Sequence, residues 1–187
     1  MAKKIGPWTQ IKAETAYENP WIKVTHENVL NPNGGEGIYG KVHFKNIAVG
    51  VVPIFSDGTT ILVGQYRYPL DRYSWEIPEG GCPHSEKPID AARRELLEET
   101  GIRCKTITSI AKFDISNSVS DEIAELFLAT DLSLGESEPD DTEQLEVKRL
   151  HISEAINMVH TGEITDSLSV IALQKIELQL LKNELSF

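Results

Sequence analysis

The sequence is poor in cysteine, in aromatic residues and in positive charge. Its two cysteines, Cys82 and Cys104, lack CxxC spacing and a matching histidine array, which argues against a zinc site or a disulfide framework. Eighteen lysines and arginines face 29 aspartates and glutamates, giving a net charge of −11. Such a chain has no broad positive surface for a nucleic acid backbone. An anionic substrate would therefore need a local arginine or a bound metal cation.

Long apolar runs are also missing. No run approaches the roughly 20 residues that span a bilayer, and no signal-peptide core follows the first residues. We therefore expect a soluble, cytoplasmic protein with neither a membrane nor a nucleic acid as partner. The 187 residues, 40% hydrophobic and 25% charged, are ordinary for one globular domain with a small appendage.

The first 45 residues predict a small antiparallel sheet. Short alternating or apolar stretches at 8–13, 21–27 and 38–44 are separated by turn-forming residues, including Asn-Pro-Asn-Gly-Gly at 31–35. A strand-only piece of this size is rarely stable alone in water. We expect it to pack on the main body or on a partner chain.

The remainder, residues 46–187, predicts strands mixed with three helices. An apolar run at 47–55, a Ser-Asp-Gly turn and a second run at 60–65 are typical of a hairpin. This order of elements favours an α+β sandwich around a mixed sheet. Further strands are expected at 106–113, 124–129 and 145–151, and helices at 88–100, 153–160 and 167–185.

The predicted helix 88–100 carries an unfavourable charge pattern. Glu95, Glu98 and Glu99 share an arc about 100° wide. Like charges three and four residues apart, and negative charge in the last turn, each destabilise a helix slightly. A divalent cation bound by these carboxylates would relieve the repulsion. The alternative is a solvated glutamate face.

The wider string favours the metal site. From Gly80 to Ile102 the sequence matches Gly, five residues, Glu, seven residues, Arg-Glu-apolar-any-Glu-Glu-any-Gly-apolar. This pattern resembles the Nudix box at every specified position, and chance would produce it on the order of once in 10⁷ chains of this length. The resemblance implies a Nudix-type α/β/α sandwich over residues 46–187, preceded by a β-sheet segment at 1–45.

The resemblance also implies roles for residues of the box. The expected activity is Mg²⁺-dependent, or Mn²⁺-dependent, hydrolysis of a nucleoside diphosphate linked to another group. An internal ion pair is implied to brace the box and to support catalysis. By position, the implied metal ligands are Glu95, Glu98, Glu99 and the backbone carbonyl of Glu79. Glu98 is also implied to be catalytic. The bracing ion pair is Arg94 with Glu86.

Segments outside the box resemble ADP-ribose and nucleotide-sugar pyrophosphatases. In Gly-Gln-Tyr-Arg-Tyr-Pro at 64–69, Arg67 is implied to contact substrate phosphate, and Glu76 to orient Arg67 or help hold metal. Asn-Ser at 117–118 replaces the Pro-Gly turn of that subgroup, while Glu122 is still placed to face the site. We therefore expect ADP-ribose, a GDP-hexose such as GDP-mannose, or both, as substrate.

The general base and the dimer are also suggested by this resemblance. An acidic loop at 136–144 is the counterpart of the subgroup's mobile loop, and Glu143 is our choice of base, with Asp141 second; a merely solvated loop is the alternative. Trp21 fits a substrate-binding role in an N-terminal sheet exchanged across a homodimer.

Three alternative functions remain open. The first is a different Nudix pyrophosphatase activity, on dinucleotides or on RNA caps and 5′ ends. The others are a non-catalytic nucleotide-sugar sensor and a plain metal-binding domain.

Overall fold

The computed structural model describes residues 2–135 and 145–186, which form two compact units. Among the described residues, the first unit contains 2–47 and 114–123, and the second contains 48–113, 124–135 and 145–186. Residues 114–123 thus group with the N-terminal sheet, although the sequence placed them in the second domain. None of the helices in the described ranges is long and apolar enough to cross a membrane.

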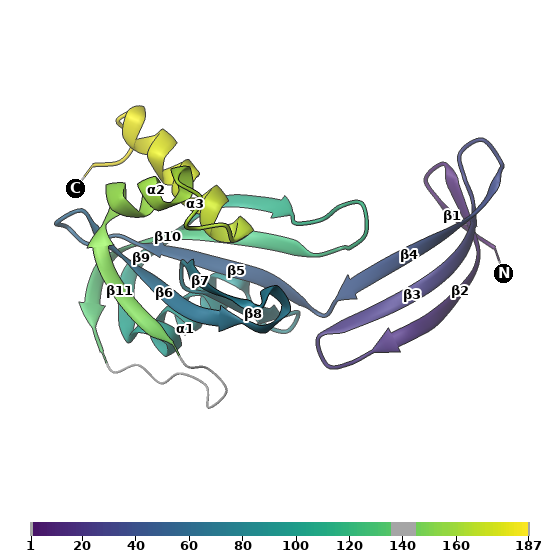
Figure 1. The fold of residues 1–187 in the computed structure, drawn as a ribbon, viewed down its shortest axis with the longest axis horizontal. Helices are drawn as coiled ribbons and strands as arrows, with labels where there is room; N and C mark the ends of the chain where they lie inside the picture. Colours follow the sequence, from purple (N-terminus) through teal and green to yellow (C-terminus); the bar gives the residue numbers. More distant parts are fainter. Residues whose placement is uncertain (1, 136–144, 187) are drawn as a thin grey trace. The chain divides into compact units, whose positions relative to one another are not determined.

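The first unit is an antiparallel sheet with strand order β1-β2-β3-β4 (Figure 1). The sequence predicted three strands, and the structure adds a short fourth at the N-terminus. Irregular pairing at two points in β2 interrupts its register with β3. The strands are β1 (Lys3–Ile5), β2 (Trp8–Glu18), β3 (Ile22–Leu30) and β4 (Glu36–Phe44).

The segment 114–123 attaches to the last strand of this sheet. The Val42 N–H donates to the Val119 carbonyl at 2.9 Å, and Val42 forms an isolated parallel bridge with Ser120. His43 Nδ1 lies 2.6 Å from Asp121 Oδ2. Backbone and side-chain bonds together therefore fix this segment onto β4.

The second unit holds two sheets, with orders β8-β5-β10-β9 and β11-β6-β7. β5 pairs with β10 in parallel, whereas β6 pairs antiparallel with both β11 and β7. The strands are β5 (Asn46–Pro53), β6 (Thr59–Arg67), β7 (Arg72–Glu76), β8 (Glu79–Pro83), β9 (Ile102–Asp114), β10 (Ile123–Leu134) and β11 (Glu146–His151).

The predicted hairpin of β5 and β6 is wrong. These strands are joined by a tight turn, but only Ile54 and Thr60 form a bridge, and the strands then enter different sheets. The apolar runs explain the difference, because Val49, Val51, Val52 and Leu62 are all fully buried and need cover on both faces. Each strand therefore becomes an inner strand of its own sheet.

Three helices complete the part of the second unit that the structure describes. They are α1 (Pro88–Thr100), α2 (Ile152–His160) and α3 (Ser167–Leu181), and a 3-10 turn, η1 (Tyr68–Leu70), precedes β7. Figure 1 shows α1 on one side of the sheets and α2 with α3 on the other, which gives the predicted α+β sandwich. The last helix ends at Leu181, four residues before the predicted end.

Local signals explain why α1 begins and ends where predicted. Pro88 occupies the first turn, where a missing N–H costs nothing, and Asp90 lies near the positive end of the helix dipole. Gly101 adopts φ 69° at the C-terminus, and its N–H donates to the Leu97 carbonyl at 2.8 Å. Ala91, Ala92, Leu96 and Glu99 are the buried residues of α1, whereas Glu95 and Glu98 are partly exposed.

Candidate active site

One arginine gathers the acidic side chains of the box. Arg94 Nη1 donates to Glu95 Oε1 at 2.8 Å and to Glu98 Oε2 at 2.9 Å. Its Nε and Nη2 donate to Glu86 at 3.3 and 3.1 Å, and Nη2 also donates to the Gly81 carbonyl at 3.0 Å. The planar guanidinium thereby ties the loop before α1 to two carboxylates of the helix.

Several carboxylates surround Arg94. Hydrogen bonds with Glu86, assisted by the charge of Glu95, raise the pKa of Arg94 and keep it positive. That single charge faces three contacting carboxylates, and Glu99 adds a fourth on the same helix. This donor set suits a hard divalent cation, which prefers carboxylate and carbonyl oxygens.

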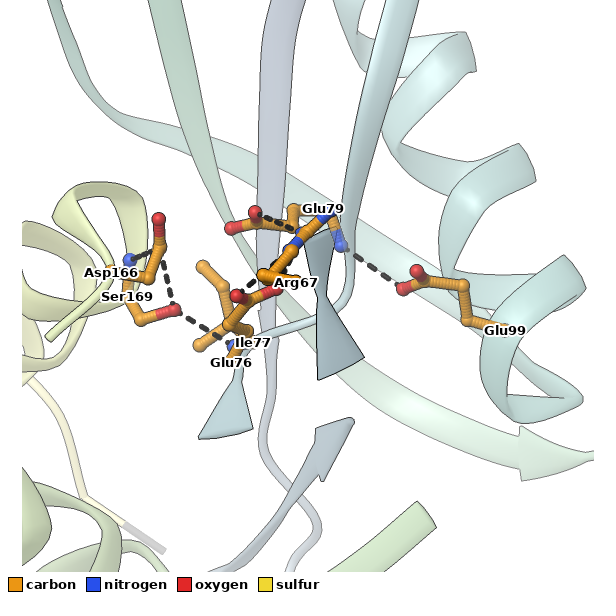
Figure 2. A network of polar contacts seen from close by, with 7 residues as sticks. All are labelled: Arg67, Glu76, Ile77, Glu79, Glu99, Asp166 and Ser169. Carbon is orange, nitrogen blue, oxygen red and sulfur yellow. Dashed lines mark hydrogen bonds and ion pairs between the residues drawn. The ribbon is translucent and has the colours of Figure 1, made fainter. Parts of the chain in front are cut away.

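A second link joins the helix to the entry of the box. Glu99 is only 4% exposed, and its Oε2 accepts the Glu79 N–H at 3.0 Å (Figure 2). Burying a carboxylate is costly unless it is hydrogen-bonded or paired with positive charge. The bond also places the backbone of Glu79 beside the helix carboxylates.

Gly80 is required by a close approach between the box entry and the helix. A Cβ built on Gly80 would overlap the carboxyl carbon and both carboxyl oxygens of Glu95. Any side chain at this position would therefore displace Glu95. Absence of a side chain lets the strand β8 pass directly against the carboxylate.

Arg67 lies at the centre of a second polar cluster, formed with Glu76, Glu79 and Asp166 (Figure 2). Its Nε donates to both carboxyl oxygens of Glu76 at 3.0 Å, and its Nη2 binds Glu76 Oε2 and, at 3.0 Å, Glu79 Oε1. Burial opposes the charged form of Arg67, but these partners outweigh it and raise its pKa. The guanidinium is thus held in a fixed orientation.

The carboxylates of this cluster are crowded. One oxygen each of Glu76, Glu79 and Asp166 lies within 4.8 Å of the others. Burial, followed by the charges of Asp166 and Glu76, raises the pKa of Glu79 well above its usual value, although Arg67 acts in the opposite direction. Glu76 itself is only 2% exposed. Arg67 supplies the positive charge that this buried group requires.

The structure brings together most of the residues that the sequence singled out. Glu86, Arg94, Glu95 and Glu98 form one connected group, Arg67 and Glu76 belong to the second, and Glu79 contacts both Glu99 and Arg67. Their roles toward metal and substrate stay predictions. Glu143 and Asp141 lie outside the described residues.

Two predicted substrate residues belong to the first unit. Trp21 is 66% exposed, and its backbone N–H donates to Asn19 Oδ1 at 2.9 Å. Glu122 lies in the segment 114–123, where burial raises the pKa of its carboxyl group. Its carbonyl accepts the Ile115 N–H at 3.0 Å.

Asp166 and Ser169 were not singled out from the sequence. Asp166 precedes α3, and its Oδ2 accepts the Ser169 N–H at 2.8 Å, as an N-cap residue does. The string Asp-Ser-Leu-Ser before an apolar helix carries that capping signal. Nothing in it, however, indicates contact with a segment some 90 residues earlier.

Two family models and known proteins from two Bacillus species match this sequence. The NUDIX domain model matches residues 44–169, and a model described as the nucleoside diphosphate sugar hydrolase N-terminal domain matches residues 8–42. A protein of Bacillus subtilis named ADP-ribose pyrophosphatase is 35% identical over 90% of this chain and 92% of its own. A Bacillus methanolicus protein named methanol dehydrogenase activator is 34% identical over the same shares.

A solved structure shares the fold. It is described as an ADP compounds hydrolase, with a TM-score of 0.85 and 24% identity, over 97% of this chain and 98% of that one. At this identity the likeness bears on the fold alone. Together, the domain match over residues 44–169 and the 35% identical relative are decisive for the family. The chain belongs to the Nudix hydrolase family.

Proposed function

We propose that this Nudix hydrolase cleaves the diphosphate of nucleoside diphosphate sugars, giving a nucleoside monophosphate and a sugar phosphate. The observation that carries the proposal is the group of box carboxylates held by Arg94, next to the Glu79–Glu99 bond. ADP-ribose and a GDP-hexose such as GDP-mannose are the proposed substrates. The N-terminal domain match and the name of the Bacillus subtilis relative support this substrate class.

Mg²⁺, or Mn²⁺ in its place, is the proposed cofactor. Glu95, Glu98 and Glu99, with the backbone carbonyl of Glu79, would hold it. When bound, such a cation neutralises diphosphate charge and lowers the pKa of a bound water. Arg94 and Glu86 keep the carboxylates aimed at one place, because the guanidinium contacts the loop and the helix together.

Other residues complete the proposed reaction. Arg67, oriented by Glu76, would bind a phosphate group of the substrate through its planar guanidinium. Glu143 is proposed to accept the proton of the attacking water, on sequence grounds. Trp21 and Glu122 would contact the remaining part of the nucleotide sugar.

A homodimer in the cytoplasm is proposed as the working form. The first unit carries several exposed large apolar side chains, among them Ile38 at 71% and Trp21 at 66%. An exposed apolar set on one small sheet is typical of a protein interface. Light scattering on the purified chain should therefore give twice the monomer mass.

The proposal predicts both the products and the metal requirement. Incubation with ADP-ribose, GDP-mannose, a dinucleotide and a 5′-triphosphate, followed by chromatography, should show a nucleoside monophosphate and a sugar phosphate from a nucleotide sugar. A chelator should abolish the turnover, and added Mg²⁺ or Mn²⁺ should restore it, because the box carboxylates alone repel a diphosphate. Turnover restricted to 5′-triphosphates or capped RNA would contradict the substrate class while leaving the family intact.

Replacing Arg67 by lysine should weaken substrate binding more than turnover. Lysine keeps the charge but loses the fork that contacts both oxygens of Glu76. We expect KM to rise about tenfold, with a smaller fall in kcat. Arg72→Lys, at an exposed arginine that donates to Thr165 Oγ1, is the control. Equal KM values for Arg67→Lys and the native protein would exclude the phosphate contact.

Replacing Gly80 by alanine should move Glu95. Because the new Cβ would overlap the Glu95 carboxylate, this side chain must leave its place beside Arg94. We expect kcat to fall about tenfold, since misplaced groups are costly in catalysis. Gly40→Ala is the matched control, because a Cβ there meets no atom within 4 Å. Comparable kcat values for the two variants would show that the position of Glu95 is unimportant.

A further inference from the structure

The turn between β7 and β8, residues 76–79, is held at four consecutive residues by four different elements. Glu76 binds Arg67 of β6, and the Ile77 N–H donates to Ser169 Oγ of α3 at 3.0 Å. The Pro78 carbonyl accepts the Val51 N–H of β5 at 2.8 Å, and the Glu79 N–H donates to Glu99 of α1. The other three contacts come from β6, β5 and α1, whereas Ser169 belongs to α3, the last helix.

The burial and orientation of Ser169 favour its hydrogen bond with the Ile77 N–H. The residue is fully buried, and its hydroxyl donates to Asp166 Oδ2 at 2.9 Å (Figure 2). With its proton committed to Asp166, the hydroxyl oxygen presents lone pairs to the Ile77 N–H. Asp166 therefore fixes the direction of the bond that Ser169 accepts, in addition to capping α3.

We propose that Ser169, oriented by Asp166, is a positioning residue that fixes the metal-binding end of the box from the last helix. Ile77 lies two residues before Glu79, whose N–H meets Glu99 and whose carbonyl is a proposed metal ligand. Loss of the Ser169 bond would leave a buried N–H without a partner and allow the turn to shift. The proposal rests on the proposed metal-dependent function.

Mn²⁺ binding without substrate tests the inference directly. In the full chain, Ser169→Ala should weaken Mn²⁺ binding, measured by electron paramagnetic resonance of the free ion, by about tenfold, as is usual for groups that orient metal ligands. The Mg²⁺ concentration for half-maximal turnover should rise by a similar factor. KM at saturating Mg²⁺ should change much less.

Thr60→Val is the matched control. Thr60 is 1% exposed, and its hydroxyl donates to the Pro53 carbonyl at 2.7 Å, so the variant also loses one buried hydrogen bond to backbone. Both variants should melt at lower temperature, but Thr60→Val should keep native Mn²⁺ binding. If Ser169→Ala binds Mn²⁺ as Thr60→Val does, Ser169 has only a structural role and the inference is wrong.

Two variants of Asp166 keep the inference testable if Ser169→Ala fails to fold. Asp166→Asn retains an oxygen that can accept from Ser169, so Mn²⁺ binding should stay closer to the native value than in Asp166→Ala. Asp166→Ala removes it and should weaken binding about tenfold. Equal binding by these two variants would overturn the inference. A native protein that binds Mn²⁺ but hydrolyses no nucleotide sugar would instead contradict the proposed function, leaving this comparison valid.

Discussion

Replacing Glu99 by glutamine should lower kcat at least about 100-fold, because it removes one negative charge from the proposed metal site. Glu99 is nearly buried, at 4% exposure, so its charge is little screened by solvent. The side chain also keeps its volume in this substitution. A loss of activity would therefore result from the removed charge and not from a cavity left in the packing.

The fold should survive this change for an identifiable reason. Glutamine has one carbonyl oxygen, which can still accept the Glu79 N–H that Glu99 Oε2 accepts at 3.0 Å. Repulsion between Glu99 and Glu95, four residues apart on α1, also falls. We expect a melting temperature equal to or slightly above that of the native protein.

Asp90→Asn is the control for Glu99→Gln. It removes the same charge from the same helix, at an exposed position in the first turn. Its turnover should stay within about twofold of native, since the change affects only the exposed end of the helix dipole. Native kcat and unchanged Mg²⁺ dependence in Glu99→Gln would exclude Glu99 from the metal site.

The parts of the fold that depend on local signals were predictable from the sequence. Pro88 and Gly101 set the ends of α1, and the spacing of the box singled out Glu95, Glu98 and Glu99, whose role toward a metal stays a prediction. The helix period then places these carboxylates on one side. These predictions need only residues within one or two turns of each other.

Long-range pairing was not predictable in the same way. A turn at 56–58 between two apolar runs is typical of a hairpin, yet β5 and β6 lie in separate sheets because both need cover on two faces. The contact of Ser169 with Ile77 joins residues 92 positions apart. No periodicity or spacing encodes such a contact, since it depends on how the last helix packs.

Replacing Arg94 by lysine should lower kcat about 100-fold, because the box carboxylates depend on its guanidinium for their arrangement. The guanidinium contacts Glu86, Glu95 and Glu98 together with the Gly81 carbonyl, using three nitrogens. A lysine ammonium is one point of charge on a flexible stem, so it can approach one or two of these groups. The remaining carboxylates would then separate under their own repulsion.

Arg93→Lys provides the matched control on the neighbouring residue. Arg93 donates to the Cys104 carbonyl at 2.6 Å and to the Lys105 carbonyl at 3.3 Å, so its hydrogen bonds run to β9 and away from the box glutamates. Both substitutions exchange the same groups on the same helix, and Arg93→Lys should also lose stability, by about 1 kcal/mol, because it breaks hydrogen bonds to backbone. Only Arg94→Lys should lose turnover and require more Mg²⁺.

The pair of variants separates a catalytic arrangement from simple helix stabilisation. If Arg94 served only to hold α1 against β8, loss of turnover would follow loss of stability, and the two variants would fall on one line when kcat is plotted against melting temperature. We expect instead that Arg94→Lys lies far below that line at a temperature where both proteins are folded. Raising Mg²⁺ should recover part of its activity, since a bound cation replaces some of the charge neutralisation that Arg94 provides. Turnover of Arg94→Lys equal to that of Arg93→Lys would mean that the glutamates find their places without the guanidinium.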